Sequence, residues 1–393
     1  MSRPAAILGG GVNGLAVARS LGRQSIAVYL FTTEVRDIAA TSRFVSCAIH
    51  VDTDHPESFV AELAFIASKH GAKPIIIHTS DDFLMLSSTH RAALEPYCDV
   101  NLPATEIVER VIDKGAFNAF CAAQELPAPL SWCPRSQADL QHCIAGACFP
   151  LVIKPALSNS IGRYRFVKDG KPRKMVHVKT AAELQTQFEE LYSPECPLLV
   201  QEFIEGADSE HYSFFSYRSK DHRELIGFGV RKKRIYPVHS GAGTCVEICE
   251  EPELAKAARQ VIDVLGYTGS SSTCFKRCAL TGKLVLHEVN GRLPAWHGIS
   301  QLGNLDLPLM AYRYECGLQT EIGRVEANKG NWIILRSDFA AFRAYRKRGE
   351  LSILQWLRSL AHARVCAEFA RDDLHPLFHH LGAMMRRTIE RQQ

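Results

Sequence analysis

The segment ILGGGVNGLAVARSLG, residues 7–22, constrains the fold more than any other part of the chain. Gly9, Gly11 and Gly14 fit the pattern G-x-G-x-x-G, with an apolar predicted strand before them and a predicted helix after them. A strand, a glycine turn and a helix in this order are typical of a parallel sheet covered by helices. The same pattern is the fingerprint of dinucleotide binding. One hypothesis is therefore a nicotinamide- or flavin-dependent oxidoreductase, with Glu34 near the end of the second strand as the ribose ligand.

Length and composition indicate a soluble protein with more than one domain. The chain has 393 residues, of which 46% are hydrophobic and 22% are charged, and this length exceeds one ordinary core. No apolar run reaches the ~18 residues of a membrane helix, and no signal-peptide pattern is present, so we expect a cytoplasmic protein. The net charge of +4 is too small to indicate nucleic acid as a partner.

The cysteines indicate a reducing environment. Their number, thirteen, is odd, and they are scattered without a small-domain framework, so we expect most of them to be reduced, buried thiols. The pairs Cys245/Cys249 and Cys274/Cys278 leave a zinc site as an alternative. Their three-residue gaps differ from the usual C-x₂-C spacing, and both pairs fall in predicted strands.

The pattern of predicted elements changes twice along the chain. Residues 1–104 alternate apolar strands with helical patterns, which predicts a Rossmann-like region. Residues 105–324 contain longer strands and two hairpins, with turns at Asp169-Gly170 and at Thr281-Gly282. Residues 325–393 are basic, and we expect them to be mostly helical.

Two features of the middle region could bind a nucleotide. Lys154 ends an apolar strand and precedes the small, polar loop of residues 157–162, so an ammonium group and backbone N–H groups could hold phosphate oxygens. The sequence VQEFIEG, residues 200–206, could present a backbone donor, a backbone acceptor and an apolar slot to a purine. The alternative for Lys154 is a lysine that simply extends from a strand end into solvent, and the alternative for residues 200–206 is a solvated edge strand.

Two further features could serve metal binding and phosphoryl transfer. Glu288 and Asn290 alternate on one predicted strand, so they share a face about 7 Å apart, as hard oxygen ligands for Mg²⁺ would. Arg292 is in phase with them and could neutralise a transferring phosphoryl group. The basic run of residues 231–234 precedes a turn with glycines. The alternative for Glu288 and Asn290 is a hydrogen-bonded structural pair, and the alternative for the basic run is a solvated charged face.

In this order and spacing, the four features resemble the ATP-grasp superfamily over residues 1–320. The resemblance includes the Asp113-Lys114 dipeptide at the start of a predicted helix and the E-x-N-x-R motif. Shorter cues are similar to the carboxylate–amine ligase group that includes D-aspartate ligases. They are SRF (42–44), TSDDFLML (79–86), R-K-x-R-x-Y-P (231–237), FKR (275–277) and RDDLHP (371–376).

The resemblance implies an α/β fold of the α+β ATP-grasp kind. It implies a Rossmann-like domain at residues 1–104, an ATP-grasp domain of two subdomains at 105–324 and a basic helical region at 325–393. It also implies a ligase that uses ATP and Mg²⁺. In such a ligase the γ-phosphoryl group passes to a small-molecule carboxylate, an amine attacks the acylphosphate, and ADP and phosphate are released.

The resemblance also assigns residues to these roles. The nucleotide would contact a set spread over both subdomains: Lys114, Lys154, Ser158, Ser160, Gly162, Gln201, Glu202, Phe203, Ile204 and Glu210. Mg²⁺ would bind Glu288 and Asn290. Lys154, Arg231 and Arg292 would stabilise the charge that develops during phosphoryl transfer.

One position departs from the superfamily pattern. The first metal carboxylate of the superfamily falls by spacing on Cys274, and a thiol is a poor ligand for a hard cation. Three alternatives remain open. One metal is held mainly by Glu288 and Asn290, a nearby acid such as Glu247 replaces the missing carboxylate, or the protein binds ATP without turnover.

The C-terminal region also leaves two alternatives. Ile353, Trp356, Leu357 and Leu360 share one face of a predicted helix, with basic residues upstream. Such a helix could lie on an anionic membrane surface. The simpler expectation, which we prefer, is a helix that packs on the rest of the protein with a solvated basic side.

Overall fold

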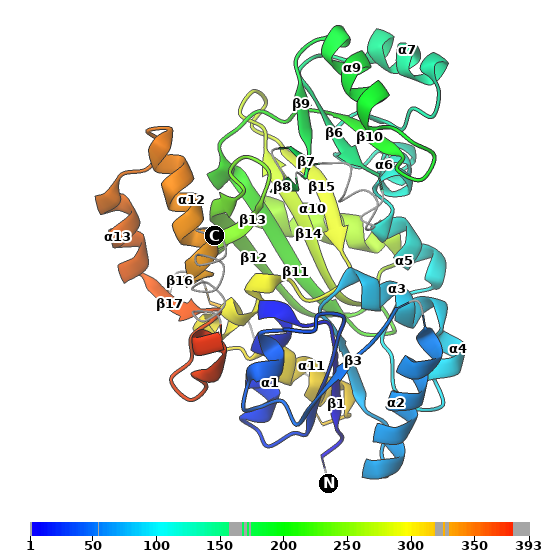
Figure 1. Cartoon of the computed structure of the whole chain (residues 1–393), viewed down its shortest axis with the longest axis vertical. Coiled ribbons are helices and arrows are strands. Elements are labelled where there is room, and N and C mark those ends of the chain that lie inside the picture. Colours follow the sequence, from blue (N-terminus) through cyan, green and yellow to red (C-terminus); the bar gives the residue numbers. More distant parts are fainter. Residues whose placement is uncertain are drawn as a thin grey trace, which may run out of the picture.

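The computed structural model describes residues 2–53, 55–156, 167–168, 171–172, 174–318, 325–326 and 330–379. Within these residues the strands form a parallel N-terminal sheet, a small antiparallel sheet, a seven-stranded sheet and a two-stranded hairpin. The seven-stranded sheet, called the central sheet below, lies between the other two sheets in the view of Figure 1. The predicted α/β fold class is confirmed.

The N-terminal sheet has four parallel strands in the order β3-β2-β1-β4. Its inner strands, β2 and β1, are buried along their whole length because helices cover both faces. Ala5 and Ile7 of β1 pack in one core with α1, and Ala6 and Leu8 pack in a second core with α2 and α3. The elements are β1 (Ala5–Leu8), α1 (Gly11–Gly22), β2 (Val28–Thr32), η1 (Ala39–Thr41), β3 (Cys47–His50), α2 (Pro56–His70), β4 (Ile75–His78), α3 (Asp81–Thr89) and α4 (Arg91–Leu94).

The small sheet is antiparallel, with the order β5-β10-β6-β9. One of its faces packs on α7 and α9 through an apolar core that includes Leu140, Ile153 and Phe188. The elements here are α5 (Thr105–Ile112), α6 (Lys114–Ala123), β5 (Ser131–Trp132), α7 (Gln137–Gly146), β6 (Leu151–Pro155), β7 (Val167–Lys168), β8 (Lys171–Pro172), β9 (Val176–Val178), α9 (Ala181–Leu191) and β10 (Leu198–Glu202). The predicted hairpin forms between β7 and β8, and its turn lies outside the described residues.

The central sheet has the order β15-β14-β11-β12-β13-β16-β17. Helix α10 covers one face through Leu254, Val261 and Leu265. It ends at Gly266 (φ 63°), the left-handed position that glycine adopts readily. The elements are η2 (Asp208–Glu210), β11 (His211–Arg218), β12 (Glu224–Tyr236), β13 (Ala242–Cys249), α10 (Pro252–Leu265), β14 (Gly269–Arg277), β15 (Leu284–Asn290), η3 (Ala295–Gly303) and α11 (Leu307–Glu315).

In its described part, the C-terminal region holds helices, as expected, and in addition two short strands that the sequence does not predict. It contains β16 (Asn331–Ile333), α12 (Leu335–Lys347), α13 (Ile353–Ala361) and β17 (Ala363–Cys366). The short strands β16 and β17 pair in parallel and extend the central sheet beyond β13. Their hydrogen bonds to a sheet built elsewhere in the chain stabilise them, and a helical pattern in the local sequence does not reveal such partners.

A buried ion pair holds α12 and α13 against the central sheet. The guanidinium of Arg234 donates to both carboxylate oxygens of Asp338, at 2.7 and 2.8 Å, and both side chains are at most 6% exposed. The indole N–H of Trp356 donates to the same carboxylate at 2.8 Å, and its ring stacks on Phe342 with centroids 4.4 Å apart. Trp356 therefore packs on the body of the protein, whereas Leu357 on the same helix is 50% exposed.

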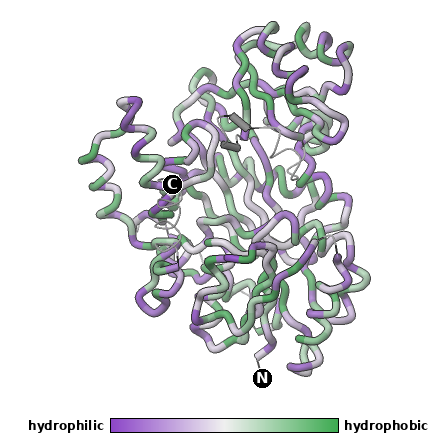
Figure 2. The backbone as a smooth tube through the Cα atoms, viewed as in Figure 1, coloured by the Kyte–Doolittle hydropathy of each residue, from purple (hydrophilic) through white to green (hydrophobic). Residues whose placement is uncertain are grey.

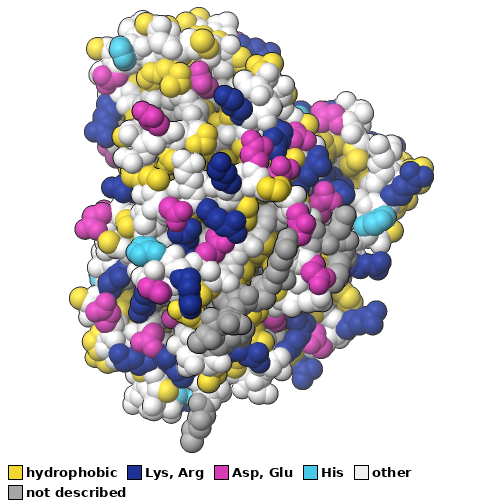
Figure 3. Space-filling view, turned by 180° about the vertical axis from the view of Figure 1, so that it is seen from behind, with side chains coloured by type: hydrophobic (Ala, Val, Ile, Leu, Met, Phe, Trp, Pro, Cys, Tyr) yellow, Lys and Arg dark blue, Asp and Glu magenta, His cyan; other side chains and the backbone are white. Residues whose placement is uncertain are grey.

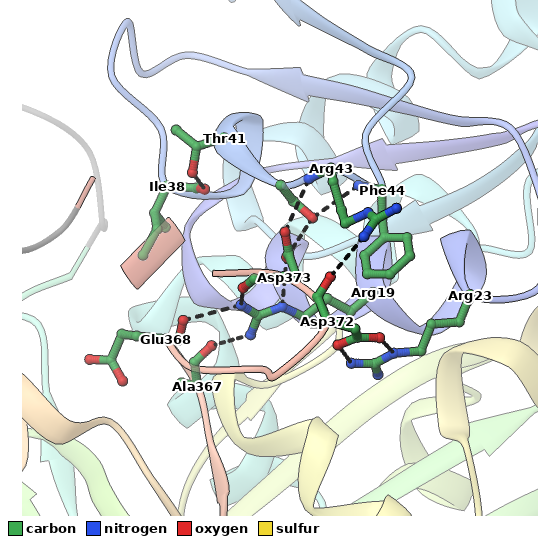
Figure 4. A network of polar contacts seen from close by, with 11 residues as sticks. Arg19, Arg23, Ile38, Thr41, Arg43, Phe44, Ala367, Glu368, Asp372 and Asp373 are labelled. Carbon is green, nitrogen blue, oxygen red and sulfur yellow. Dashed lines mark hydrogen bonds and ion pairs between the residues drawn. The ribbon is translucent and has the colours of Figure 1, made fainter. Parts of the chain in front are cut away.

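A second polar network joins the two ends of the chain (Figure 4). The carboxylate of Asp373 accepts hydrogen bonds from Arg19 Nε at 2.9 Å, from Ser42 Oγ at 2.7 Å and from the Arg43 N–H at 3.1 Å. Next to it, Arg23 forms a bidentate pair with Asp372. The cues SRF and RDDLHP therefore meet in space, and their contacts fasten the C-terminal segment to the N-terminal region.

The outer surface carries both signs of charge. Figure 2 shows hydrophobic residues concentrated along the strands, with hydrophilic residues frequent on the outer helices. On the face drawn in Figure 3, Lys and Arg side chains are interspersed with Asp and Glu. No helix in the described part of the chain is long and apolar enough to cross a membrane.

Candidate active site

The predicted phosphate lysines lie next to each other at the junction of α6 and β6. Asp113 begins α6, because its carboxylate accepts the N–H groups of Gly115 at 2.8 Å and Ala116 at 3.0 Å. The N–H of Lys114 donates to the carbonyl of Ala156 at 3.0 Å, which ties the start of α6 to the end of β6. The expectation that the Asp113-Lys114 dipeptide opens a helix is confirmed.

Lys154 is held by a side-chain network behind it. Its ammonium donates to Gln201 Oε1 at 2.9 Å, and the amide of Gln201 donates in turn to Asn118 Oδ1 and to Ser131 Oγ, each at 3.0 Å. Gln201 is 1% exposed. Burial lowers the pKa of Lys154 to about 8, and the positive charge of Lys114 adds to this effect. Gln201 thus positions the lysine instead of presenting its side chain to an adenine.

The predicted adenine slot lies at the end of β10. The carbonyl of Ile204 accepts a hydrogen bond from Lys276 Nζ at 2.9 Å, and the same ammonium lies 5.3 Å from the ring centroid of Phe203. Phe203 also makes an edge contact with His177, with ring centroids 5.0 Å apart. The side chain of Glu202 accepts the N–H of Leu130 at 3.3 Å. The apolar surface of the slot therefore comes from Phe203 and Ile204.

The predicted metal ligands share one face of β15. Asn290 Nδ2 lies 3.3 Å from Glu288 Oε1 and 3.7 Å from the sulfur of Cys274. Cys274 pairs directly with Glu288 across the β14–β15 ladder, so its side chain lies beside the predicted metal ligands. Glu247 does not replace the missing carboxylate. It lies opposite Arg231 on β13 and forms an ion pair with Lys233 at 3.0 Å.

Several lysines converge on Glu288. Burial opposes its ionisation, but nearby ammonium groups outweigh this effect and hold the pKa of the carboxyl below its ordinary value. In order of influence, these lysines are Lys232, Lys114 and Lys174. An ionised carboxylate and an amide oxygen on one strand face are suitable ligands for a single Mg²⁺. No cluster of three or more His, Cys, Asp or Glu suited to a metal occurs among the described residues.

Arg292 is fixed by a residue of the N-terminal region. Its Nε and Nη2 donate to the two carboxylate oxygens of Asp81, at 2.9 and 3.2 Å. Its Nη2 also lies 3.5 Å from Asn290 Oδ1. The backbone of the next residue is held as well, since the Leu293 N–H donates to the carbonyl of His78 at 3.1 Å. The TSDDFLML segment therefore positions the end of the E-x-N-x-R motif.

Two predicted site residues are not brought together with the others. In the strand register Arg231 lies opposite Tyr212, whereas Cys274 lies opposite Ser213. Because neighbouring residues of a strand point to opposite faces, the side chain of Arg231 points to the α10 face of the sheet, away from Glu288. There it donates to Glu210 Oε1 at 3.1 Å, so Glu210, another of the predicted nucleotide contacts, is engaged on that face as well. The next residue, Lys232, faces Glu288 instead. The predicted loop residues Ser158, Ser160 and Gly162 lie outside the described residues.

The face that carries Glu288 also holds residues to which the sequence assigned no individual role. Lys276 and Lys232 align with His211 in one row across three strands. The ring of His211 stacks on that of His287, with centroids 5.7 Å apart. Burial lowers the pKa of His211 to about 4, and that of His287 well below its ordinary value, so both imidazoles are neutral at pH 7. Strand alternation could have identified Lys232 and Lys276 if the pairing of the strands had been known.

The glycine turn after β1 holds an anion that the protein itself supplies. The Gly11 N–H donates to Asp37 Oδ1 at 2.9 Å, and Thr32 Oγ1 donates to Asp37 Oδ2 at 2.7 Å. A Cβ atom on Gly10 would lie 1.5 Å from that carboxylate, so glycine is required there. Because Asp37 occupies the place of a pyrophosphate, the fingerprint describes the fold of the turn and does not support a dinucleotide site.

Comparisons with known proteins give a curated relative in sequence and solved structures of similar fold. No protein-family model matches the chain. A curated D-aspartate ligase from Enterococcus faecium (strain Aus0004) is 22% identical over 262 residues, which are 64% of this chain and 62% of the relative, less than two thirds of its length.

Solved structures show the fold. The biotin carboxylase domain of the Hydrogenobacter thermophilus 2-oxoglutarate carboxylase, in complex with MgADP, ADP and bicarbonate, has a TM-score of 0.64 at 14% identity, over 84% of this chain and 74% of that one. The L-amino acid ligase from Bacillus licheniformis has a TM-score of 0.58 at 13% identity, over 77% and 70%. The chain therefore shares the fold of these solved structures, in agreement with the ATP-grasp fold that the sequence predicts, and its sequence is similar to that of a curated D-aspartate ligase.

Proposed function

We propose that this protein is an ATP-dependent carboxylate–amine ligase that works through an acylphosphate. The observation that carries the proposal is the convergence of Lys114, Lys154 and Lys232 on Glu288, beside an Arg292 held in a fixed orientation. A concentration of fixed positive charge around one carboxylate suits a triphosphate with a bound cation. The homology to a D-aspartate ligase supports the choice of an amine as the second substrate.

The residues of the chain divide the work of phosphoryl transfer. Lys114 and Lys154 bind the α- and β-phosphates, and the apolar slot at Phe203 and Ile204 holds the adenine. Arg292 stabilises the charge that develops as the γ-phosphoryl group moves to a carboxylate oxygen of the substrate. A bound Mg²⁺, held by Glu288 and Asn290, would neutralise phosphate charge.

The second step forms the amide. The electron pair of the amine attacks the acyl carbon. The bond from that carbon to the phosphate oxygen then breaks, and phosphate leaves with the electron pair of that bond. The neutral amine loses one proton as the product forms, and that proton passes to the departing phosphate or to solvent. This step requires that water stay away from the acylphosphate, because hydrolysis would return the free acid.

Release of ADP tests the proposal. Full-length protein with Mg-ATP is screened against amino acids and short-chain acids in pairs, with D-aspartate tested both as the carboxylate and as the amine, and the adduct is detected by mass. We expect ADP release to depend on both substrates. Lys154→Met and Glu288→Ala should each nearly abolish it, whereas Lys256→Met, on the exposed side of α10, should retain it.

Two outcomes would favour the alternatives. Binding of Mg-ATP without ADP release over the whole panel would assign the chain a nucleotide-binding role without catalysis, as Cys274 allows. Thermal stabilisation by NAD(P) or FAD, with none by Mg-ATP, would favour an oxidoreductase, although Asp37 occupies the glycine turn that such an enzyme needs. Unchanged ADP release in both site variants would refute the site assignment.

A further inference from the structure

The surroundings of Cys274 decide how many cations the site can hold. Cys274 is 7% exposed and lies directly across the ladder from Glu288. The hydroxyl of Ser213 donates to its sulfur at 3.3 Å, and the amide of Asn290 points at the same sulfur from 3.7 Å. A soft sulfur donor enclosed in this way is a poor ligand for Mg²⁺, which prefers oxygen.

The strands next to β15 offer no carboxylate on this face. Among the described residues, the side chains that β14, β11 and β12 direct to the side of Glu288 near it are Ser272, Cys274, Lys276, His211, Ser213 and Lys232. A second divalent cation would need anionic oxygens of its own, and two-cation phosphoryl-transfer sites supply them from acidic side chains. Asp81 does not serve, because the fork of Arg292 engages both of its oxygens.

Lys232 supplies positive charge at the same place. Its side chain lies one row along the sheet from Ser213 and Cys274, on the side of Glu288. Among the ionised groups around Glu288, Lys232 has the largest effect on that carboxyl. Within the described part of the chain, its ammonium makes no hydrogen bond or ion pair, so it is available to phosphate oxygens.

We infer that the site binds one divalent cation with each nucleotide, at Glu288 and Asn290, and that the ammonium of Lys232 takes the place of a second cation beside Cys274. An ammonium needs no carboxylate ligands, which explains why a thiol is tolerated opposite Glu288. The inference rests on the proposed nucleotide binding and does not depend on the identity of either substrate.

The stoichiometry of Mn²⁺ tests the inference without turnover. Equilibrium dialysis of the full chain with Mn²⁺ and a saturating, non-hydrolysable ATP analogue counts the bound metal. We expect one Mn²⁺ per wild-type chain, one in Cys274→Ser and two in Cys274→Asp, because only the aspartate adds an anionic ligand. Two Mn²⁺ per wild-type chain would overturn the inference. Tighter binding of Cd²⁺ than of Mn²⁺, with the ultraviolet band of a metal thiolate, would overturn the inference too, because Cys274 would then be a ligand.

Affinity for the analogue tests Lys232 independently. Lys232→Met should weaken binding by about tenfold or more at unchanged metal stoichiometry, since a charged contact to phosphate is lost. The matched control is Lys233→Met, whose side chain pairs with Glu247 on the other face and should leave affinity unchanged. Equal affinities in all three proteins would overturn the role of Lys232. Failure of the wild-type chain to bind any nucleotide would instead refute the proposed function.

Discussion

Raising the pH from 7 to 9 should weaken nucleotide binding through a single group, the ammonium of Lys154. Burial at the end of β6 lowers its pKa from 10.5 to about 8. The difference corresponds to a penalty of about 3 kcal/mol on the charged form. The lysine is therefore charged at pH 7 and loses its proton within the range of an ordinary binding assay.

The size of the effect follows from that pKa. With a pKa near 8, the protonated fraction of Lys154 falls from about nine tenths at pH 7 to about one tenth at pH 9. Only the ammonium form carries the positive charge that attracts phosphate oxygens, so affinity for ATP should fall by about tenfold over this range. The last ionisation of a phosphate monoester lies near pH ~6, so the charge of the nucleotide itself changes little.

The assay is calorimetric titration of the full chain with a non-hydrolysable ATP analogue and Mg²⁺ at several pH values. The matched control is Lys154→Arg, because a guanidinium stays charged throughout this range. We expect the logarithm of the association constant to decline above pH 8 in the wild type and to stay level in the arginine variant. Lys154→Met should bind weakly at every pH.

Two results would refute this reasoning. If wild-type affinity were the same at pH 7 and pH 9, Lys154 would not be the group that titrates in contact with phosphate. If Lys154→Arg declined as steeply as the wild type, the titrating group would be another lysine. Lys174 and Lys276 are such groups, because burial lowers the pKa of each as well.

Three further predictions concern stability. Arg234→Met leaves Asp338 buried without its cation and should lower the free energy of unfolding in urea by about 3–5 kcal/mol, whereas the double variant with Asp338→Leu should recover much of the loss; an equal loss in both would contradict this. Gly10→Ala forces a methyl group against a carboxylate at 1.5 Å and should cost about 1–3 kcal/mol, seen as a lower melting temperature; an unchanged melt would show that the loop relaxes freely. Asp373→Ala should expose the C-terminal segment to limited proteolysis, while the more exposed Asp372→Ala, a change worth about 1 kcal/mol or less, should not; equal cleavage of the two variants would argue against the buried network.

Local patterns were sufficient to predict the N-terminal sheet and the long hairpins of the central sheet. The turn at Thr281-Gly282 and the glycine stop of α10 are encoded by neighbouring residues, so both appear where the sequence places them. The strands β16 and β17 are different. Each has only three or four residues, and they pair with each other across two intervening helices, so the sequence near them carries a helical pattern and no sign of the partner.

The candidate site shows the same limit at the level of single residues. Alternation along β15 correctly places Glu288 and Asn290 on one face. Alternation shows which residues of one strand share a face. It does not show which residues of β12 share a face with Glu288 on β15, because β11 and β14 lie between these two strands. The basic run at 231–234 was therefore recognised as a group, but which member faces Glu288 required the register, and it is Lys232 instead of Arg231.

The N-terminal region carries a dinucleotide fingerprint but serves the proposed active site in a different way. Its glycine turn makes an anion site in the manner of a dinucleotide fold, and Asp37 from the same region fills that site. The start of α3 instead presents Asp81 to Arg292, which directly follows the strand that carries the proposed metal ligands. The Rossmann-like sheet thus contributes to the proposed chemistry by fixing a guanidinium that belongs to the central sheet. A change at Asp81 should therefore alter phosphoryl transfer more than nucleotide affinity, because Asp81 acts through Arg292, the residue proposed to stabilise the transferring phosphoryl group.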